Sequence, residues 1–417
     1  MATPIIWIIS ALSIGLVISR PFKVPEYVWA VGGAGLLLVF RLLTLPEGLA
    51  GVAKGLDVYL FLTGMMLLAE TAREEKLFDW LAAHATRLAR GSAPRLFLLV
   101  YLVGVVVTTF LSNDATAVVL TPAVASAVRA AKVKNPLPYL FICAFIANAA
   151  SFVLPISNPA NLVIYGAHMP PLLTWLPRYL LPATVAIVAT YFLLRRTQRA
   201  AIGQDIAQNI ELPALGRGGQ VALAGIGLTA VALLVASALD SPLGLPTALT
   251  GTLTAGVVLL TARKSPVAIA RNVSWSVLPL VAGLFVLVEA LTKTGITRWL
   301  ITQLDAGAGQ STAKTAWASG IGVALLCNVM NNLPVGLLTG NVLQAAHISE
   351  TIKSALLIGI DLGPNLSVTG SLATILWLVA LRRENVAVGT WQFLKLGALV
   401  MTVPLLLAIA SLFLLPH

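Results

Sequence analysis

The stretch CNVMNNLPVGL, residues 327–337, places three asparagines, a proline and a glycine inside a long apolar segment. Apolar residues predominate on both sides of it, from residue 313 to residue 346. A proline interrupts the hydrogen bonds of a helix, and unpaired backbone groups are costly in hydrocarbon unless protein or a water-lined cavity satisfies them. The stretch therefore predicts a turn at membrane depth that exposes amide groups to a central pocket.

The composition of the whole chain indicates a polytopic membrane protein. Of its 417 residues, 58% are hydrophobic and only 10% are charged, whereas soluble domains carry about 25% charged residues. The net charge of +11 comes from short basic clusters between apolar stretches. Such clusters orient a protein in the lipid bilayer, so nucleic acid is not an expected partner.

A second apolar segment, 96–128, carries SND at residues 112–114. Like 313–346, it is longer than the roughly 20 residues that cross a bilayer once. Basic residues flank it at both ends, which marks both ends as cytoplasmic, so the segment is predicted to be a re-entrant hairpin. Segment 313–346 is its counterpart and is expected to enter from the opposite side.

Two further segments are predicted to be broken helices. Residues 137–168 contain PISNPAN at 155–161, and residues 351–381 contain DLGPNLSVTGS at 361–371. In each of them proline or glycine interrupts the helix, and the neighbouring Asn, Ser and Thr side chains can supply substitute hydrogen bonds. The two breaks and the two hairpin tips are expected to converge near the bilayer midplane.

Eight other apolar stretches have the length of a plain span: 3–19, 26–45, 57–72, 172–194, 218–237, 244–262, 274–292 and 388–414. With the two broken helices they make ten crossings. Both termini are expected outside, because most of the 27 Lys and Arg residues then lie in cytoplasmic loops. The predicted fold class is an all-α polytopic membrane protein with ten transmembrane helices and two re-entrant hairpins.

The chain is predicted to consist of two repeats, residues 1–196 and 218–417, joined by a cytoplasmic linker at 197–217. Each repeat would have five crossings and one hairpin, and an odd number of crossings inverts the second repeat, as in many secondary transporters. Two amphipathic helices are expected to lie in the interface as arms. Their apolar stripes are Leu77, Phe78, Leu81 and Leu88 in the first, and Ile296, Trp299, Leu300 and Leu304 in the second.

The polar interruptions supply the candidate site residues. A carboxylate at bilayer depth costs about 2.5–3.5 kcal/mol on insertion scales, so Asp114 and Asp361 are predicted to couple protons. A structural role as a helix cap is an equal alternative for Asp361. The predicted substrate-binding residues are Ser112, Asn113, Thr116, Asn158, Asn161, Asn328, Asn331, Asn332, Asn365, Thr369 and Ser371. A single Asn or Ser in a membrane helix is otherwise interhelical glue worth roughly 0.6 kcal/mol.

Metal and enzyme chemistry have little support. The four histidines are scattered, and no H-E-x-x-H or P-loop motif is present, so no metal, cofactor or catalytic residue is expected. Cys143 and Cys327 belong to different segments. Cys327 is the one candidate for a thiol contact with a substrate.

Four motifs resemble the bacterial arsenite efflux permease of the ion transporter superfamily: FLSNDATAVVLTP (110–122), SNPANLV (157–163), MNNLPVGLL (330–338) and DLGPNLSVTGSLATILWL (361–378). The resemblance extends over essentially the whole chain. It implies export of arsenite and antimonite across the bacterial inner membrane, driven by protons through an elevator movement. It also implies a homodimer and, in some bacteria, a soluble arsenite-stimulated ATPase partner.

Sodium-coupled relatives in this superfamily have Ser-Asn-Thr at both hairpin tips. Here Asp114 and Leu333 replace the threonines, which favours protons over sodium. Arsenite is mainly an uncharged trihydroxide near neutral pH, and a pocket of Asn, Ser and Thr suits it. Three alternatives are kept: a sodium- or proton-coupled anion carrier, a cation/proton antiporter of the same superfamily, and the passive membrane subunit of an ATPase-driven arsenite pump.

Overall fold

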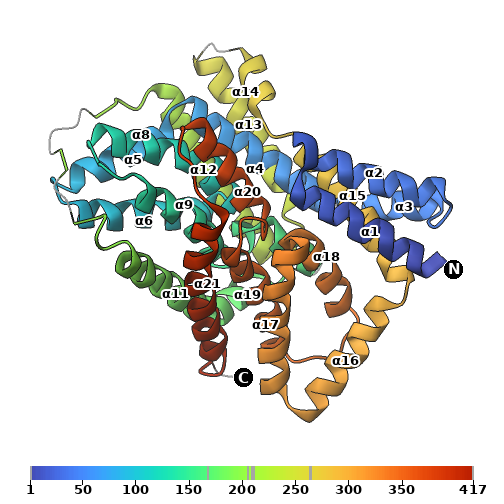
Figure 1. Cartoon of the computed structure of the whole chain (residues 1–417). Helices are drawn as coiled ribbons and strands as arrows, with labels where there is room; N and C mark the ends of the chain where they lie inside the picture. The colour runs from blue at the N-terminus through green and yellow to red at the C-terminus, as the bar shows by residue number, and fades with distance from the viewer. Residues whose placement is uncertain (1, 167–168, 204–205, 208–211, 263–264, 416–417) are drawn as a thin grey trace.

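The computed structural model describes residues 2–166, 169–203, 206–207, 212–262 and 265–415 (Figure 1). These residues form helices connected by turns and loops, without strands. The helices are α1 (Ala2–Ser19), η1 (Pro21–Lys23), α2 (Glu26–Val39), α3 (Leu45–Ala53), α4 (Leu56–Glu74), α5 (Leu77–Leu88), α6 (Ala93–Phe110), α7 (Asn113–Ala115), η2 (Thr116–Leu120), α8 (Thr121–Ala130), α9 (Leu137–Ala149), η3 (Pro155–Ser157), α10 (Pro159–Tyr165), α11 (Leu172–Thr197), α12 (Arg217–Ala238), α13 (Gly244–Ala262), α14 (Pro266–Asn272), α15 (Val277–Lys293), α16 (Ile296–Gln310), α17 (Thr312–Met330), α18 (Asn332–Leu343), α19 (Glu350–Leu362), η5 (Gly363–Leu366), α20 (Leu372–Arg383) and α21 (Thr390–Leu412).

The helices give a multi-pass membrane protein. Among the described residues, α6, α11, α12, α13 and α21 are long and apolar enough to cross a membrane. Two bent pairs, α3 with α4 at 48° and α15 with α16 at 71°, raise that number to seven when each pair counts as one span. Shorter apolar helices include α1, α2 and α9. The count of ten full crossings stays a prediction.

The order of elements is the same in the two halves of the chain. A turn with a left-handed residue, Lys76 or Gly295, leads from α4 into α5 and from α15 into α16. A pair of helices interrupted at a tip follows, then two short helices around a break, then the long helix α11 or α21. The helices are therefore interrupted at the residues where the sequence predicted it, and the re-entrant course of the two hairpins stays a prediction. The inverted orientation and the repeat boundaries stay predictions, and residues 204–205 and 208–211 of the linker lie outside the described residues.

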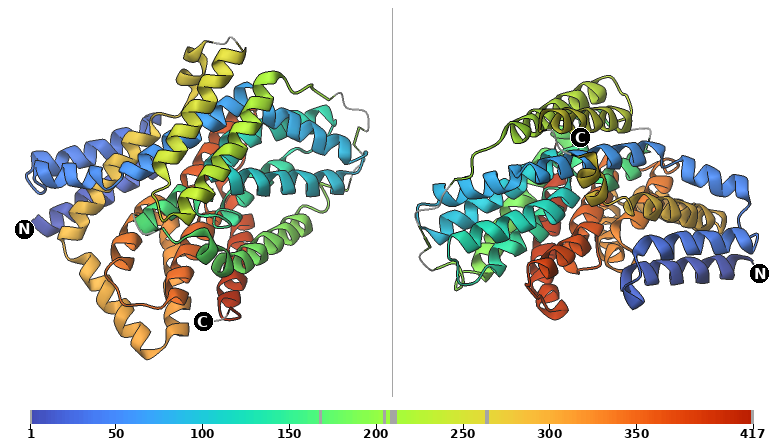
Figure 2. Two further views of the ribbon diagram at one scale, coloured as in Figure 1. Left: turned by 180° about the vertical axis from the view of Figure 1, so that it is seen from behind. Right: turned by 90° about the horizontal axis from the view of Figure 1, so that it is seen from above.

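Helices from the two halves pack against each other. α4 lies along α13, and α2 lies along α15. Figure 1 shows α1, α2, α3 and α15 grouped on one side, with α5, α6 and α8 on the opposite side. Seen from above, the pair α12 and α13 lies on the face away from α20 (Figure 2).

The two arm helices exist where the sequence predicted them. α5 packs against α6 and α8, and α16 packs against α17 and α18, so each arm contacts its own hairpin. Leu77 and Phe78 are buried, as expected for the apolar stripe. Leu88 and Trp299 were expected on these stripes but are 62% and 57% exposed. Leu88 is the last residue of α5.

Glycines set the contact between α4 and α13. A Cβ added at Gly251 would lie 2.3 Å from the carbonyl oxygen of Gly64, and one added at Gly64 would lie 2.1 Å from the carbonyl oxygen of Thr247. Small residues allow membrane helices to approach closely and gain van der Waals contact. This contact joins the first half of the chain to the second.

Gly251→Leu is therefore expected to destabilise the protein by about 1–3 kcal/mol, the usual effect of overpacking. The measurement is thermal unfolding of the purified chain in detergent. The matched control is Gly256→Leu on the same helix, where an added Cβ would meet no atom within 4 Å. Equal unfolding temperatures for the two variants would contradict the role given to the contact.

Candidate functional site

The two hairpin tips have the same local construction. Ser112 follows α6 with φ 148°, and Asn331 separates α17 from α18 with φ 72°. Both residues cap the next helix, because the Ser112 side chain accepts a hydrogen bond from the Ala115 amide and the Asn331 side chain accepts one from Leu333. Capping side chains satisfy the free amides at the start of a helix. By bonding these amides, Ser112 and Asn331 stabilise the interruption of the helix at each hairpin tip.

The broken helices resume at capped N-termini as well. α10 begins after Asn158, whose Oδ1 accepts a hydrogen bond from the Ala160 amide at 3.0 Å. α20 begins after Ser371, whose Oγ accepts one from the Thr374 amide at 3.2 Å. The N-terminus of a helix carries a partial positive charge. Two such ends therefore lie at the breaks.

Hydrogen bonds join the two broken helices to each other. Asn158 Nδ2 donates to Asp361 Oδ1. Asn148 Nδ2 donates to Asn365 Oδ1 at 2.9 Å, and Ser371 Oγ donates to Asn148 Oδ1 at 3.3 Å. Asn148, Asp361, Asn365 and Ser371 are fully buried and Asn158 is nearly so. The two breaks therefore meet inside the protein.

The second hairpin is bonded to the loop at residues 363–371. Asn328 Nδ2 donates to the Gly363 carbonyl at 2.9 Å and Asn328 Oδ1 accepts from Ser367 Oγ at 2.7 Å. Asn331 Nδ2 donates to the Thr369 carbonyl at 3.3 Å. The Asn332 amide donates to the Gly370 carbonyl at 2.9 Å. The predicted residues of this hairpin and of the second break therefore form one network.

The first hairpin contacts the first break. Ser157 Oγ donates to the Thr109 carbonyl at 2.9 Å, and Thr116 Oγ1 bonds Thr108 Oγ1 within the hairpin at 2.8 Å. Asn161 Nδ2 donates to the Ser151 carbonyl at 2.9 Å. All four interruptions predicted from the sequence thus connect through described hydrogen bonds.

Asp114 lies at a cavity of about 60 Å³ beside the first hairpin tip, and Ser112 and Pro159 share its lining. The opposite wall belongs to α4 and to the residues before α15, including Glu70 and Asn272. Among the described lining residues there is no lysine or arginine. The cavity therefore lies between the first hairpin tip and α4, and the residues before α15 complete this part of its lining.

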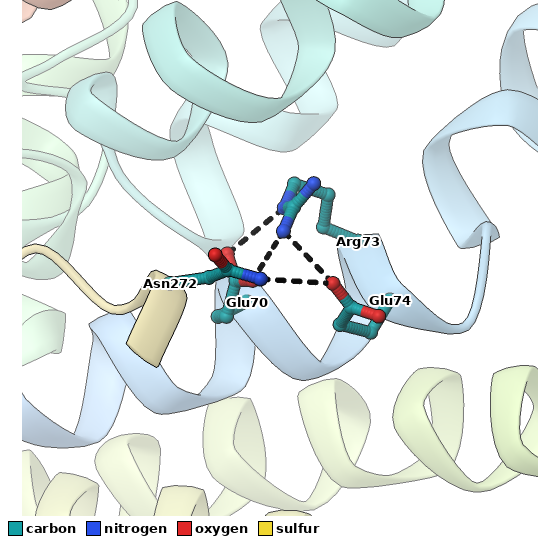
Figure 3. A network of polar contacts seen from close by, with 4 residues as sticks. All are labelled: Glu70, Arg73, Glu74 and Asn272. Carbon is teal, nitrogen blue, oxygen red and sulfur yellow. Dashed lines mark hydrogen bonds and ion pairs between the residues drawn. The ribbon is translucent and has the colours of Figure 1, made fainter. Parts of the chain in front are cut away.

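Glu70 lines the same cavity as Asp114 and was not among the residues predicted from the sequence. It is 6% exposed, and Arg73 holds its carboxylate with two hydrogen bonds, from Nε at 2.9 Å and from Nη2 at 2.5 Å. Arg73 also bonds Glu74, which accepts a hydrogen bond from Asn272 at 3.3 Å (Figure 3). The sequence feature that could have identified Glu70 is its charge, because it lies inside the span predicted at 57–72.

Cys327 is fully buried, and its Sγ donates to the Ile360 carbonyl at 3.8 Å. It therefore lies in the contact between α17 and α19, and its carbonyl partner belongs to the residue that precedes Asp361. A contact between its thiol and a substrate stays a prediction. In the described part of the chain, no group of three His, Cys, Asp or Glu side chains has the arrangement of a metal site.

Three buried side-chain oxygens near the breaks have no hydrogen-bond partner among the described residues: Asn113 Oδ1, Asn161 Oδ1 and Asp361 Oδ2. Buried polar atoms are nearly always hydrogen-bonded. The two amide oxygens can only accept hydrogen bonds. Asp361 Oδ2 also accepts when the carboxyl group is ionised, and it donates when it carries a proton. A ligand that donates hydrogen bonds, or a proton on Asp361, matches this set.

Apolar membrane helices interrupted around a shared polar centre define a multi-pass membrane transporter. Solved structures with a similar fold include the YdaH transporter of Alcanivorax borkumensis (TM-score 0.56, 15% identity, 88% of this chain and 86% of that one) and MtrF of Neisseria gonorrhoeae (TM-score 0.57, 15% identity, 89% and 84%). These likenesses show the fold alone.

Residues 5–360 match the citrate transporter family, and the chain belongs to that family. Its curated relatives include the arsenical pump membrane protein of Escherichia coli, 30% identical over 80% of each chain, and that of Yersinia enterocolitica, 29% identical with the same coverage. An uncharacterized transporter of Mycobacterium tuberculosis is 25% identical over 93% of this chain and 92% of its own. The resemblance to arsenite efflux permeases is thereby confirmed.

Proposed function

We propose that this chain is a secondary active transporter that exports arsenite and antimonite from the cytoplasm in exchange for protons. The observation that carries the proposal is the buried centre where amides, hydroxyls and one carboxylate from both broken helices meet. Relatives that are named arsenical pump membrane proteins support the same substrate class. Asp114 and Asp361 are the proposed proton-coupling residues.

The neutral trihydroxide form of the substrate fits the polarity of the centre. Its three hydroxyl groups would donate to acceptors such as Asn113 Oδ1 and Asn161 Oδ1, which no described residue satisfies. Asn and Ser side chains can in turn donate to its oxygens. Weak contacts of this kind suit a passenger that must also leave. The other proposed contacts are Ser112, Thr116, Asn158, Asn328, Asn331, Asn332, Asn365, Thr369 and Ser371.

The proposed movement is an elevator, in which the hairpins and broken helices travel together past α4, α13, α2 and α15. Hydrogen bonds within the moving group support this division, because they connect each hairpin to a break. An inverted repeat would give the group equivalent outward and inward positions. Ten crossings, inner-membrane location, outside termini and a homodimer belong to the same proposal.

Exchange of an uncharged solute for one proton moves one charge inward. At 100 mV this is worth about 2.3 kcal/mol. That free energy supports a concentration gradient of about 50-fold before any pH difference is added. Export therefore needs no ATP in this proposal, and an ATPase partner would add driving force from another polypeptide.

The family description favours one second candidate, a carrier of a carboxylate anion. The capped N-termini of α10 and α20 at the breaks could bind an anion. Against it, the described lining of the cavity at Asp114 includes acidic residues and no basic ones. Direct comparison of arsenite with citrate as transported solutes separates the two candidates.

The test is solute uptake into everted membrane vesicles and into liposomes that contain the purified chain alone. We expect arsenite accumulation that antimonite inhibits, that a protonophore abolishes and that citrate leaves unchanged. Accumulation driven only by sodium, or only after an ATPase is added, would contradict proton exchange. Uptake of citrate without arsenite would support the anion carrier instead.

A further inference from the structure

The two broken helices carry polar residues at equivalent places. Asn148 is the second-last residue of α9, and Asp361 is the second-last residue of α19. Asn158 caps α10, and Ser371 caps α20. In sequence, Asn158 follows Asn148 by the same interval of ten residues that separates Ser371 from Asp361. Asn148 is thus the counterpart of Asp361 in the first half of the chain.

The hydrogen bonds between the two broken helices obey this equivalence. The cap of the first half bonds the second-last residue of the second half, since Asn158 donates to Asp361. The cap of the second half bonds the second-last residue of the first half, since Ser371 donates to Asn148. The two bonds are therefore equivalent: each joins the cap of one half to the second-last helical residue of the other half. Both bonds join residues more than 200 positions apart in the sequence, so they depend on tertiary packing and not on a local turn.

Asn148 has a second bond that a carboxylate at its place would not make. Its Nδ2 donates to Asn365 Oδ1 at 2.9 Å, and Asn365 Nδ2 donates to the Phe145 carbonyl at 3.2 Å. Ionised carboxylates only accept hydrogen bonds. The amide at position 148 therefore fixes the orientation of Asn365 as well as that of Ser371, and the three side chains are fully buried.

We propose that Asn148 is a positioning residue of the central site, acting as the uncharged counterpart of Asp361. It holds Asn365 and Ser371 in the orientation in which they contact the transported solute. The role in transport rests on the proposed function, whereas the reciprocal pairing of the broken helices does not.

The first experiment tests the pairing by thermal unfolding of the purified full chain. Two double-mutant cycles are measured, Asn148→Ala with Ser371→Ala and Asn158→Ala with Asp361→Ala. In both cycles we expect the unfolding temperature of the double variant to lie about 2–4 °C above the value that adding the two single shifts gives. Each single variant leaves one buried partner unpaired, whereas the double variant removes both partners. Additive shifts in the first cycle would overturn the inference.

The second experiment measures arsenite uptake at varied arsenite concentration. Asn148→Ala and Asn148→Leu are both expected to raise the half-saturating concentration about tenfold or more, because both remove the two hydrogen bonds. Asn341→Ala is the matched control, since it removes an amide bond to Thr292 on α15 and is expected to change the concentration less than threefold. A near-normal Asn148→Leu would mean that residue 148 only fills space, and would overturn the positioning role.

Where Asn148→Ala does not fold, Asn148→Asp serves instead, because it keeps the acceptor for Ser371 and loses only the donor to Asn365. We expect a raised half-saturating concentration in this variant too, and an unchanged value would overturn the role. A wild-type chain that takes up no arsenite would refute the proposed function. The unfolding cycles would then decide the pairing on their own.

Discussion

Replacing Asp114 with asparagine is expected to abolish proton-driven arsenite uptake, with an initial rate lower by about two orders of magnitude. Asparagine has nearly the same shape as aspartate, so the first hairpin tip and the cavity of about 60 Å³ beside it should persist. The amide does not bind or release a proton between the two sides of the membrane. The movement would then lack one of its two proposed proton-coupling carboxylates.

The uptake assay uses everted vesicles, with the amount of folded protein measured by size-exclusion chromatography. Asp240→Asn is the matched control, because Asp240 lies in the loop between α12 and α13 with φ 50°, a conformation that asparagine tolerates as well. The control is expected to retain uptake within twofold. An Asp114→Asn variant that still accumulates arsenite under a proton gradient would refute the coupling role.

The hairpin tips show what the local sequence specifies. Ser112 and Asn331 were recognisable because clustered polar residues are expensive inside an apolar segment, and Pro334 follows Asn331 closely. The structure interrupts the helices at these residues, with positive φ values and capping side chains. Local backbone chemistry was sufficient there, since a cap and its helix are neighbours in the chain.

The partners across the site depended on the fold. Asn148 bonds Asn365, 217 residues away, and Asn158 bonds Asp361, 203 residues away. Asn148 lies in the helical part of its segment, next to apolar neighbours, so its sequence surroundings resemble those of an interhelical hydrogen bond. Asn148 lies beside the predicted site residues Asn365 and Ser371 only because the two broken helices pack against each other.

Glu70 illustrates a second limit. Its position near the end of a predicted span is typical of a residue that reaches the membrane surface. The structure instead buries its carboxylate against Arg73 and places it on the same cavity as Asp114. The sequence shows that position 70 is charged. It does not show that α4 turns this residue toward the first hairpin, because that contact depends on tertiary packing.

Two variants of Asp361 are expected to distinguish the effect of its charge from the effect of its hydrogen bond. Asp361→Asn keeps an oxygen for Asn158 Nδ2, so it is expected to fold and to lose proton-driven uptake. Asp361→Ala removes the acceptor and leaves the Asn158 amide buried without it, which should lower stability by about 2–3 kcal/mol as well. The measurements are thermal unfolding and vesicle uptake, made on the same preparations.

The comparison decides between the two roles given to this carboxylate. If Asp361 only fastens the first break to the second, Asp361→Asn will transport arsenite at nearly the wild-type rate, because an amide oxygen accepts the same hydrogen bond. If Asp361 carries the coupled proton, the amide will be stable and inactive. The second outcome is expected, because Asp361 is fully buried, and a buried carboxylate that no cation neutralises is costly unless it takes up a proton.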